Sequence, residues 1–302
     1  MEFGRISERK LNTINYELPK DSPLNKVILS GVRVASPKVY IGCSKWGRSE
    51  WVGKIFPRRT AERGFLENYA KNYNGIELDA THYKMYSTKS IGKWADKTYG
   101  NDFKYCPKMY QEVTHSGSLT GKRHVIEEFL AGVAVLREQL GPIFIQLGDS
   151  FSPHRKNELF HFLKSLPTHL QFFLEVRHED WFKNVEVHAE LFNFMTEHKI
   201  GAVITDTYTR RDCAHMQLTI PKVFIRFVAH SLHTSDYERI NEWVTRIKGW
   251  LNNGIEEIYF FMHLENEAYF PELSTYMIEK VNIDCDLDLK VPEFVKKKFS
   301  FF

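Results

Sequence analysis

The sequence has few of the features that assign a chain to a specialised class of protein. It holds only four cysteines, which are widely spaced and form no C-x-x-C pair. This spacing argues against a zinc ribbon or a thioredoxin-like motif. No apolar run approaches the roughly 18 residues of a membrane span, and the first ten residues lack the apolar stretch of a secretory signal. We therefore expect a cytoplasmic protein with reduced thiols and no membrane partner.

Charge of one sign is also scarce. The net charge is +3, so nucleic-acid binding would require local clustering of basic residues. Hydrophobic residues make up 43% of the chain and aromatic residues 14%, which is enough for a large core. A chain of 302 residues forms one or two domains, and α/β barrels often reach this size as one unit.

The pattern of polar and apolar residues changes at Lys38. Residues 1–37 are polar and punctuated by prolines, and we expect an N-terminal extension that is irregular or contains one short helix. From Lys38 onward, short apolar runs alternate with amphipathic stretches, so we place a single barrel domain at residues 38–285. Residues 286–302 form a tail whose Phe-Ser-Phe-Phe end is a plausible contact site for a partner.

The alternation predicts parallel strands with crossover helices. Eight runs have the length and composition of strands: Val39–Cys43, Gly75–Leu78, Phe103–Pro107, Ile143–Leu147, Gln171–Val176, Ala202–Thr205, Val223–Phe227 and Glu257–Met262. Helical periodicity occurs in residues 61–73, 123–140, 155–165, 187–199, 237–252 and 267–281. Eight strands with alternating helices predict an α/β fold of the TIM (β/α)8 barrel type. A doubly wound sheet is the alternative, but no G-x-G-x-x-G follows the first strand.

Polar residues recur at the carboxyl ends of the predicted strands. In a barrel, interior residues at this level face the mouth, where barrel enzymes carry their chemistry. The expected ring contains Glu77, Lys108, Gln146, Glu175, Arg177, Asp206, Arg226 and His263. The alternative is a purely structural network in which the carboxylates only neutralise the cations, because an unpaired buried charge is costly.

The mixture of charges favours an anionic ligand. Lys108, Arg177 and Arg226, with His178 and His263 nearby, suit a carboxylate or phosphate. A carboxylate with a shifted pKa could then serve as general acid or base, and the catalytic candidates are Glu77, Glu175 and Asp206. Aromatic side chains also follow the strands, either to stack on a ligand or to cap the core; the ligand-binding candidates among them are Trp46, Tyr83 and Trp181.

A divalent metal is the rival hypothesis at the same position. Carboxylates and the His263 imidazole are suitable ligands. The interleaved lysine and arginine side chains would repel such an ion, so we assign no metal ligands and no cofactor. The first strand is not followed by an H-x-H pair, which argues against a metal-dependent amidohydrolase site.

A series of short motifs resembles the YecE-like family, also called domain of unknown function 72. The series spans about residues 38–282 and includes Ile41–Trp46, Thr81-His82-Tyr83, Thr114-His115, Gln146-Leu147, Glu175-Val176-Arg177-His178, Trp181-Phe182, Asp206 and Arg226. The resemblance implies a TIM barrel similar to the xylose-isomerase and endonuclease-IV group, and hence phosphate, sugar or DNA ligands by analogy. It implies no settled activity. The sequence departs from the family pattern at Gly148-Asp149 and at the ends of strands seven and eight.

Three hypotheses about function remain open at this point. The first is an enzyme or binding protein for an anionic small molecule or sugar phosphate. The second is a nucleic-acid-binding or metal-dependent phosphodiester-processing protein, which would show steep salt dependence. The third is a non-catalytic barrel that binds a partner through the N-terminal extension or the tail.

Overall fold

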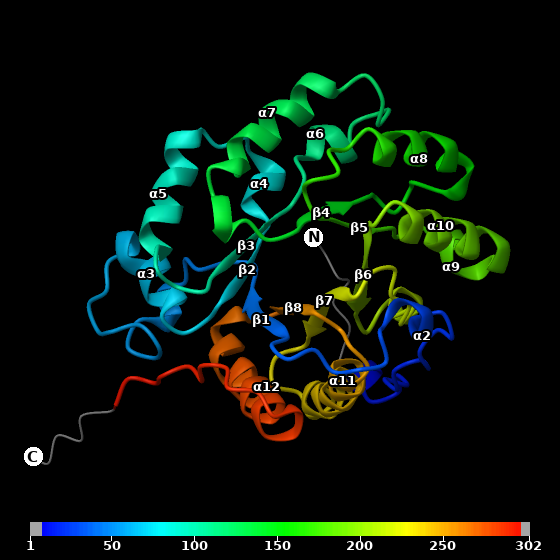
Figure 1. Ribbon diagram of the computed structural model, residues 1–302. Coiled ribbons are helices and arrows are strands. Elements are labelled where there is room, and N and C mark those ends of the chain that lie inside the picture. Colours follow the sequence, from blue (N-terminus) through cyan, green and yellow to red (C-terminus); the bar gives the residue numbers. More distant parts are fainter. Residues whose placement is uncertain (1–7, 297–302) are drawn as a thin grey trace, which may run out of the picture.

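The chain folds into parallel β-strands with α-helices outside them, as Figure 1 shows for the computed structural model, which describes residues 8–296. The described strands are β1 Lys38–Cys43, β2 Gly75–Leu78, β3 Lys104–Pro107, β4 Ile143–Gln146, β5 Phe172–Glu175, β6 Gly201–Asp206, β7 Lys222–Ala229 and β8 Glu257–Leu264. Each lies within two residues of a predicted strand, since each is a short apolar run bounded by turn residues.

The strands form two parallel sheets. Six of them make one curled sheet in the order β1-β8-β7-β6-β5-β4, and the other two pair as β2-β3. Two backbone hydrogen bonds connect β3 to β4. The Met109 amide donates to the Phe144 carbonyl at 2.8 Å, and the Gly141 amide donates to the Tyr105 carbonyl at 2.7 Å.

Side chains rather than a backbone ladder join β1 to β2, and we call this junction the β1–β2 seam. Asn74 accepts from the Ile41 amide at 2.9 Å and donates to the Val39 carbonyl at 2.8 Å. The Tyr69 hydroxyl accepts from the Cys43 amide and donates to the Gly75 carbonyl, both at 3.0 Å. The strands approach so closely that a Cβ atom on Gly42 would lie 1.9 Å from the Gly75 oxygen.

Seven longer helices lie outside the strands, among the residues described (Figure 1). They are α3 Phe65–Ala70, α5 Thr88–Thr98, α7 Arg123–Ala134, α8 Lys156–Lys164, α10 Val185–Glu197, α11 Thr234–Asn252 and α12 Phe270–Cys285. Sequence periodicity did not predict α5. Its core-facing residues are Ile91, Trp94, Ala95 and Thr98 at helical spacing, but only Ile91 and Trp94 among them are large and apolar. Single helical turns occur at α1 Glu8–Leu11, α2 Asn25–Ile28, α4 Ala80–Tyr83, α6 Gln111–Thr114 and α9 Asp180–Lys183.

Alternation along the strands separates the two largest hydrophobic clusters of the described residues. The smaller one lies on the inner face of the sheets and contains Tyr40, Cys106, Phe144, Phe173, Val203, Ile220, Phe224, Tyr259 and Phe261. The larger one fills the space between strands and helices. Gln146, Glu175 and Arg226 each come two residues after an inner phenylalanine, so they share its face. This alternation brings the polar strand ends together above an aromatic floor.

The extensions on both sides of the predicted barrel contact it. Within residues 8–37, the N-terminal extension contains two single turns, α1 and α2, where we expected at most one short helix. In the tail, the Val295 amide donates to the Lys54 carbonyl at 2.7 Å. The Phe-Ser-Phe-Phe end lies outside the described residues. The described helices are each too short or too polar to cross a membrane, and all four cysteines are buried free thiols.

Candidate functional site

The polar residues at the carboxyl ends of the strands form one contiguous group, which we call the strand-end cluster. Its members are Glu77, Asp79, Lys108, Gln146, Glu175, Arg177, Thr205, Arg226 and His263. They come from seven strands or from the residues directly after them. Seven of the eight residues predicted for the ring lie in this cluster, Asp79 and Thr205 join them, and Asp206 lies elsewhere.

Arg226 lies at the centre of the cluster and is fully buried. Its guanidinium donates to both oxygens of Glu77, at 2.7 and 3.0 Å, and to Glu175 at 3.2 Å. A buried guanidinium between two carboxylates satisfies the requirement that buried ions be paired. These contacts support the structural-network alternative for Arg226 and Glu77.

Glu175 receives donors from four directions. Besides Arg226, these are Gln146 at 2.6 Å, Thr205 at 2.9 Å and the Nε atom of Arg177 at 2.9 Å. Burial alone would raise the pKa of Glu175, but Arg177 and Arg226 outweigh it and lower the pKa to about 2. For Glu77, burial likewise raises the pKa, but the Arg226 charge outweighs it and holds the pKa well below its usual value. Both carboxylates are held ionised, which does not suit a general acid or base near neutral pH.

Asp79 and Lys108 differ from these saturated pairs. The Lys108 ammonium lies 3.7 Å from Asp79 Oδ1 and donates to Gln146 at 3.0 Å. Asp79 Oδ1 is buried without a hydrogen bond, although the side chain as a whole is 23% exposed. Burial and then the nearby Glu77 carboxylate raise the pKa of Asp79, while burial lowers the pKa of Lys108. The two pKa values thus shift toward each other.

His263, an imidazole next to the Glu77 carboxylate, is relevant to the metal hypothesis. Its Nε2 atom lies 3.1 Å from Glu77. Single ligand atoms of Glu77, Asp79 and His263 lie within 4.8 Å of one another, close enough to surround an ion. Arg226 and Lys108 already neutralise these carboxylates, and both would repel a cation. We therefore do not assign metal ligands here.

Two histidines border the cluster from the loops after β2 and β3. His82 and His115 make an edge contact with ring centroids 4.8 Å apart. His82 Nδ1 bonds the Met109 carbonyl at 2.8 Å, so this nitrogen carries the proton. Burial and then the Lys108 charge lower the pKa of His82 to about 4, and they lower that of His115 as well. Both rings are neutral at pH 7.

Asp206 does not belong to the cluster, so its expected place in the ring was wrong. Its side chain points outward to α11, where it accepts from Arg239 and from the Trp243 indole at 2.8 Å. Arg211 also pairs with it. The inward residue of β6 is Thr205, one position earlier, because strand side chains alternate between faces.

The remaining predicted ligand-binding residues lie around the cluster rather than in it. Trp181 is fully buried and donates to the Phe151 carbonyl at 2.8 Å, so it caps the core. Trp46 packs edge-on against Trp94. His178 accepts from the Asp180 amide. Tyr83 is 57% exposed, and the Asp79 charge contributes to its raised pKa after burial, so its ring is open to solvent near that carboxylate.

Sequence reasoning missed Asp79 as a site residue, although a signal was present. Asp79 follows Glu77 by two positions at the end of β2, and residues two apart on a strand share a face. The sequence places His82 and His115 in loops after β2 and β3. It does not give the conformation of these loops, which decides whether the two side chains reach the strand ends.

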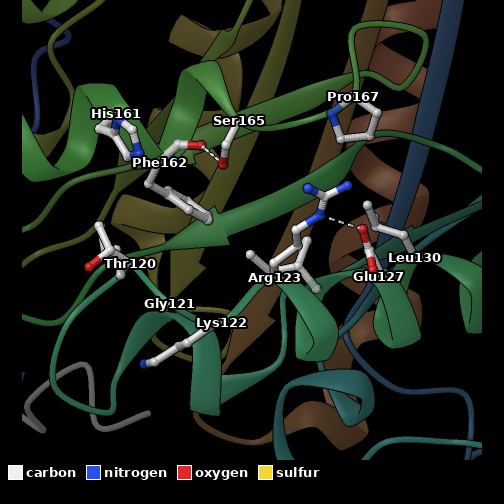
Figure 2. Close-up of a pocket in the computed structure, with 12 residues that line it drawn as sticks. Thr120, Gly121, Lys122, Arg123, Glu127, Leu130, His161, Phe162, Ser165 and Pro167 are labelled. Atoms are coloured by element: carbon white, nitrogen blue, oxygen red, sulfur yellow. Dashed lines mark hydrogen bonds and ion pairs between the residues drawn. The ribbon is translucent and has the colours of Figure 1, made fainter.

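A separate hollow of about 600 Å³ lies on the outside of the molecule between α7 and α8. Figure 2 shows Arg123 and Glu127 paired along one side, with His161, Phe162 and Ser165 on the other. Apart from that exposed ion pair, apolar side chains such as Leu130 and Phe162 contribute much of its lining. It lacks the convergent charges of the strand-end cluster, so we place the candidate site at the cluster.

Comparison with known families agrees with the motifs and the fold. The model of a family described as protein of unknown function DUF72 matches residues 40–294. The chain belongs to the DUF72 family. The resemblance inferred from the motifs is thereby confirmed. The family description leaves the activity open.

Individual relatives of the family are distant. The UPF0759 protein YecE of Escherichia coli (strain K12) is 26% identical over 253 residues, covering 78% of this chain and 89% of that protein. The UPF0759 protein YunF of Bacillus subtilis (strain 168) is 24% identical over 155 residues, covering 48% and 52%.

Solved structures from the DUF72 family share the fold. The family protein EF0366 of Enterococcus faecalis V583 aligns with a TM-score of 0.62 at 15% identity, covering 84% of this chain and all of that one. The family protein TM1631 of Thermotoga maritima MSB8 aligns with a TM-score of 0.59 at 22% identity, covering 82% and 98%. At these identities the likeness concerns the fold alone.

Proposed function

We propose that the eight strands close into a (β/α)8 TIM barrel and that the strand-end cluster is the active site of an enzyme for an anionic small molecule, such as a sugar phosphate. Closure is supported by the β1–β2 seam and by the two hydrogen bonds between β3 and β4. Catalytic sites of such barrels lie at the carboxyl ends of the strands, where this cluster lies.

The observation that carries the proposal is the pair formed by Asp79 and Lys108. A carboxyl group with a raised pKa and an ammonium with a lowered pKa are both displaced toward the neutral range, where proton transfer is most effective. The buried Asp79 Oδ1 atom has no hydrogen-bond donor within the described residues, which leaves it able to accept or deliver a proton. Glu77 and Glu175 then anchor the cations instead of acting as catalysts.

The direct anion contact would come from Arg177, and the buried Lys108 would add its positive charge. Arg177 is 15% exposed and extends from the loop after β5, whereas Arg226 is buried between its two carboxylates. A guanidinium suits the planar, bidentate recognition of carboxylates and phosphates. The exposed ring of Tyr83 would border the same ligand. Four buried free thiols support the cytoplasmic location that we propose for this activity.

Calorimetric titration with sulfate and with glucose 6-phosphate tests the proposal. We expect both anions to bind, and Arg177→Gln to weaken binding about tenfold, the loss typical of one charged hydrogen bond. Arg123→Gln, in the exposed outer hollow, is the matched control and should bind like the wild type. Lack of binding, or equal affinity for the Arg177→Gln variant, would contradict the proposal. Tighter retention of a DNA oligonucleotide than of either anion would favour the nucleic-acid alternative.

A further inference from the structure

The described part of the N-terminal extension runs along α11. Gly31 bonds the Asn253 carbonyl at one end of the helix, and Asp21 pairs with Arg246 further along. The Leu18 amide then donates to Glu242 at 2.7 Å. Because α11 begins soon after the carboxyl end of β7, the contacts of the described part of the extension run from nearer the strand-end cluster toward the opposite end of the strands. Figure 1 shows the blue α2 segment close to α11.

The same extension contacts the loop between β6 and β7 at both of its ends. We define this β6–β7 loop as residues 207–217. At its start, Arg211 donates to the Tyr16 carbonyl at 2.8 Å and pairs with Asp206. At its end, buried Asn25 donates to the Met216 carbonyl at 2.9 Å and accepts from the Leu218 amide at 2.8 Å. Two separate parts of the extension thus hold one loop.

The β6–β7 loop is a neighbour of the strand-end cluster. Cys213 of this loop lines one small cavity together with Glu175 and Thr205, two members of the cluster, and the charges of Glu175 and Arg177 act on its thiol. Arg210 in the same loop pairs with Asp212 at 2.6 Å, and Asp149, in the loop after β4, acts on Arg210. The loop therefore lies beside the cluster at the ends of β5 and β6.

We propose that Asn25 and Arg211 are positioning residues through which the N-terminal extension fixes the β6–β7 loop, and with it the side of the cluster next to Arg177. The matched family region begins at residue 40, so the fixing segment lies outside it. A loop of this length held only at its strand ends would sample many conformations. Hydrogen bonds from a separate segment reduce that sampling and preorganise the loop.

Hydrogen–deuterium exchange on the full-length protein tests this inference. Asn25→Ala removes the two bonds at the end of the loop, and Arg211→Gln removes the ion pair with Asp206. Both should speed amide exchange in residues 207–217 and leave β2 and β3 as in the wild type. Asp21→Asn, which weakens a contact between the extension and α11 but not the loop, is the control and should not change the loop.

Sulfate affinity provides a second readout that a purely structural role would not alter. This readout rests on the proposed anion site, whereas the exchange readout does not. We expect Asn25→Ala and Arg211→Gln to weaken sulfate binding at least threefold, and Arg211→Lys, which keeps the charge beside Asp206, to recover part of the loss. Unchanged exchange in residues 207–217 for Asn25→Ala would overturn the inference. Faster exchange with unchanged sulfate binding would also overturn it, while a wild type that fails to bind sulfate would refute the proposed function alone.

Discussion

The Asp79 carboxylate and the Lys108 ammonium lie 3.7 Å apart at the ends of the adjacent strands β2 and β3. Around them, Glu77 and Glu175 are bonded to Arg226. The cluster thus combines a saturated interior with an under-saturated pair, in which Lys108 is buried and only Asp79 is partly exposed. Substituting an amide for a carboxylate should therefore affect the free energy of unfolding differently at Asp79 and at Glu77.

Replacing Asp79 should stabilise the protein. Its pKa is raised in the folded state, so at pH 7 the ionised carboxylate costs free energy that the unfolded chain does not incur. Asp79→Asn removes that cost, and we expect the free energy of unfolding to rise by roughly 0.5–2 kcal/mol. Urea denaturation at pH 7 measures it. A less stable variant would show that Asp79 is a structural anchor, and its role in proton transfer would then be untenable.

Replacing Glu77 should have the opposite effect. Glu77→Gln leaves the Arg226 guanidinium buried with a weakened partner, and breaking such a pair typically costs about 3–5 kcal/mol. Equilibrium unfolding in urea should show this loss at pH 7. Glu158→Gln, which weakens a partly exposed pair with Arg155, is the comparison and should lose much less. Similar losses in the two variants would contradict the buried network.

Acid should weaken the fold in a window set partly by His82. Its folded pKa of about 4 lies below the unfolded value of about 6.5, so the unfolded chain binds more protons between these limits. Stability is therefore full above pH 6.5 and falls as the pH decreases toward 4. His82→Gln should make the free energy of unfolding less steep over this window. An unchanged slope in urea titrations at several pH values would contradict the buried, neutral state of His82.

Trp181 should matter for stability and not for ligand binding. The side chain is fully buried and its indole bonds the Phe151 carbonyl, so Trp181→Ala should lose about 3–5 kcal/mol. Sulfate affinity, measured well below the melting temperature, should remain that of the wild type. A selective loss of sulfate binding without loss of stability would restore the ligand-binding role first expected for this residue.

Protein purified without chelators should carry no stoichiometric divalent metal. Arg226 already bonds both oxygens of Glu77, and the positive charge of Lys108 lies 3.7 Å from Asp79, where it would repel a metal ion. Elemental analysis, and an unchanged melting temperature after EDTA treatment, are the measurements. One bound divalent ion per chain, lost in the Glu77→Gln variant, would replace the proposed acid–base pair with a metal centre.

The strands were predictable from sequence because each is a short apolar run between turn residues. The inward position of Arg226 or Glu175 followed from alternation within such a run. Asp206 was misplaced because the last residue of β6 was taken to face inward, while Thr205 does so. Helix α5 was missed because its stripe has only two large apolar residues, Ile91 and Trp94, although their spacing is helical. The contacts of the extension were not predictable, since single hydrogen bonds such as those of Asn25 leave no periodic signal.

The β1–β2 seam also predicts where the sheet opens locally. Strands joined by a continuous ladder separate only when several backbone bonds break together. Here the hydrogen bonds of the Asn74 and Tyr69 side chains can break one at a time, while the backbone ladders of the neighbouring strands stay intact. The Ile41 and Cys43 amides should therefore be the first strand amides to lose protection from hydrogen exchange. The seam is also the place where a chain break or a circularly permuted terminus should disturb cooperative folding least.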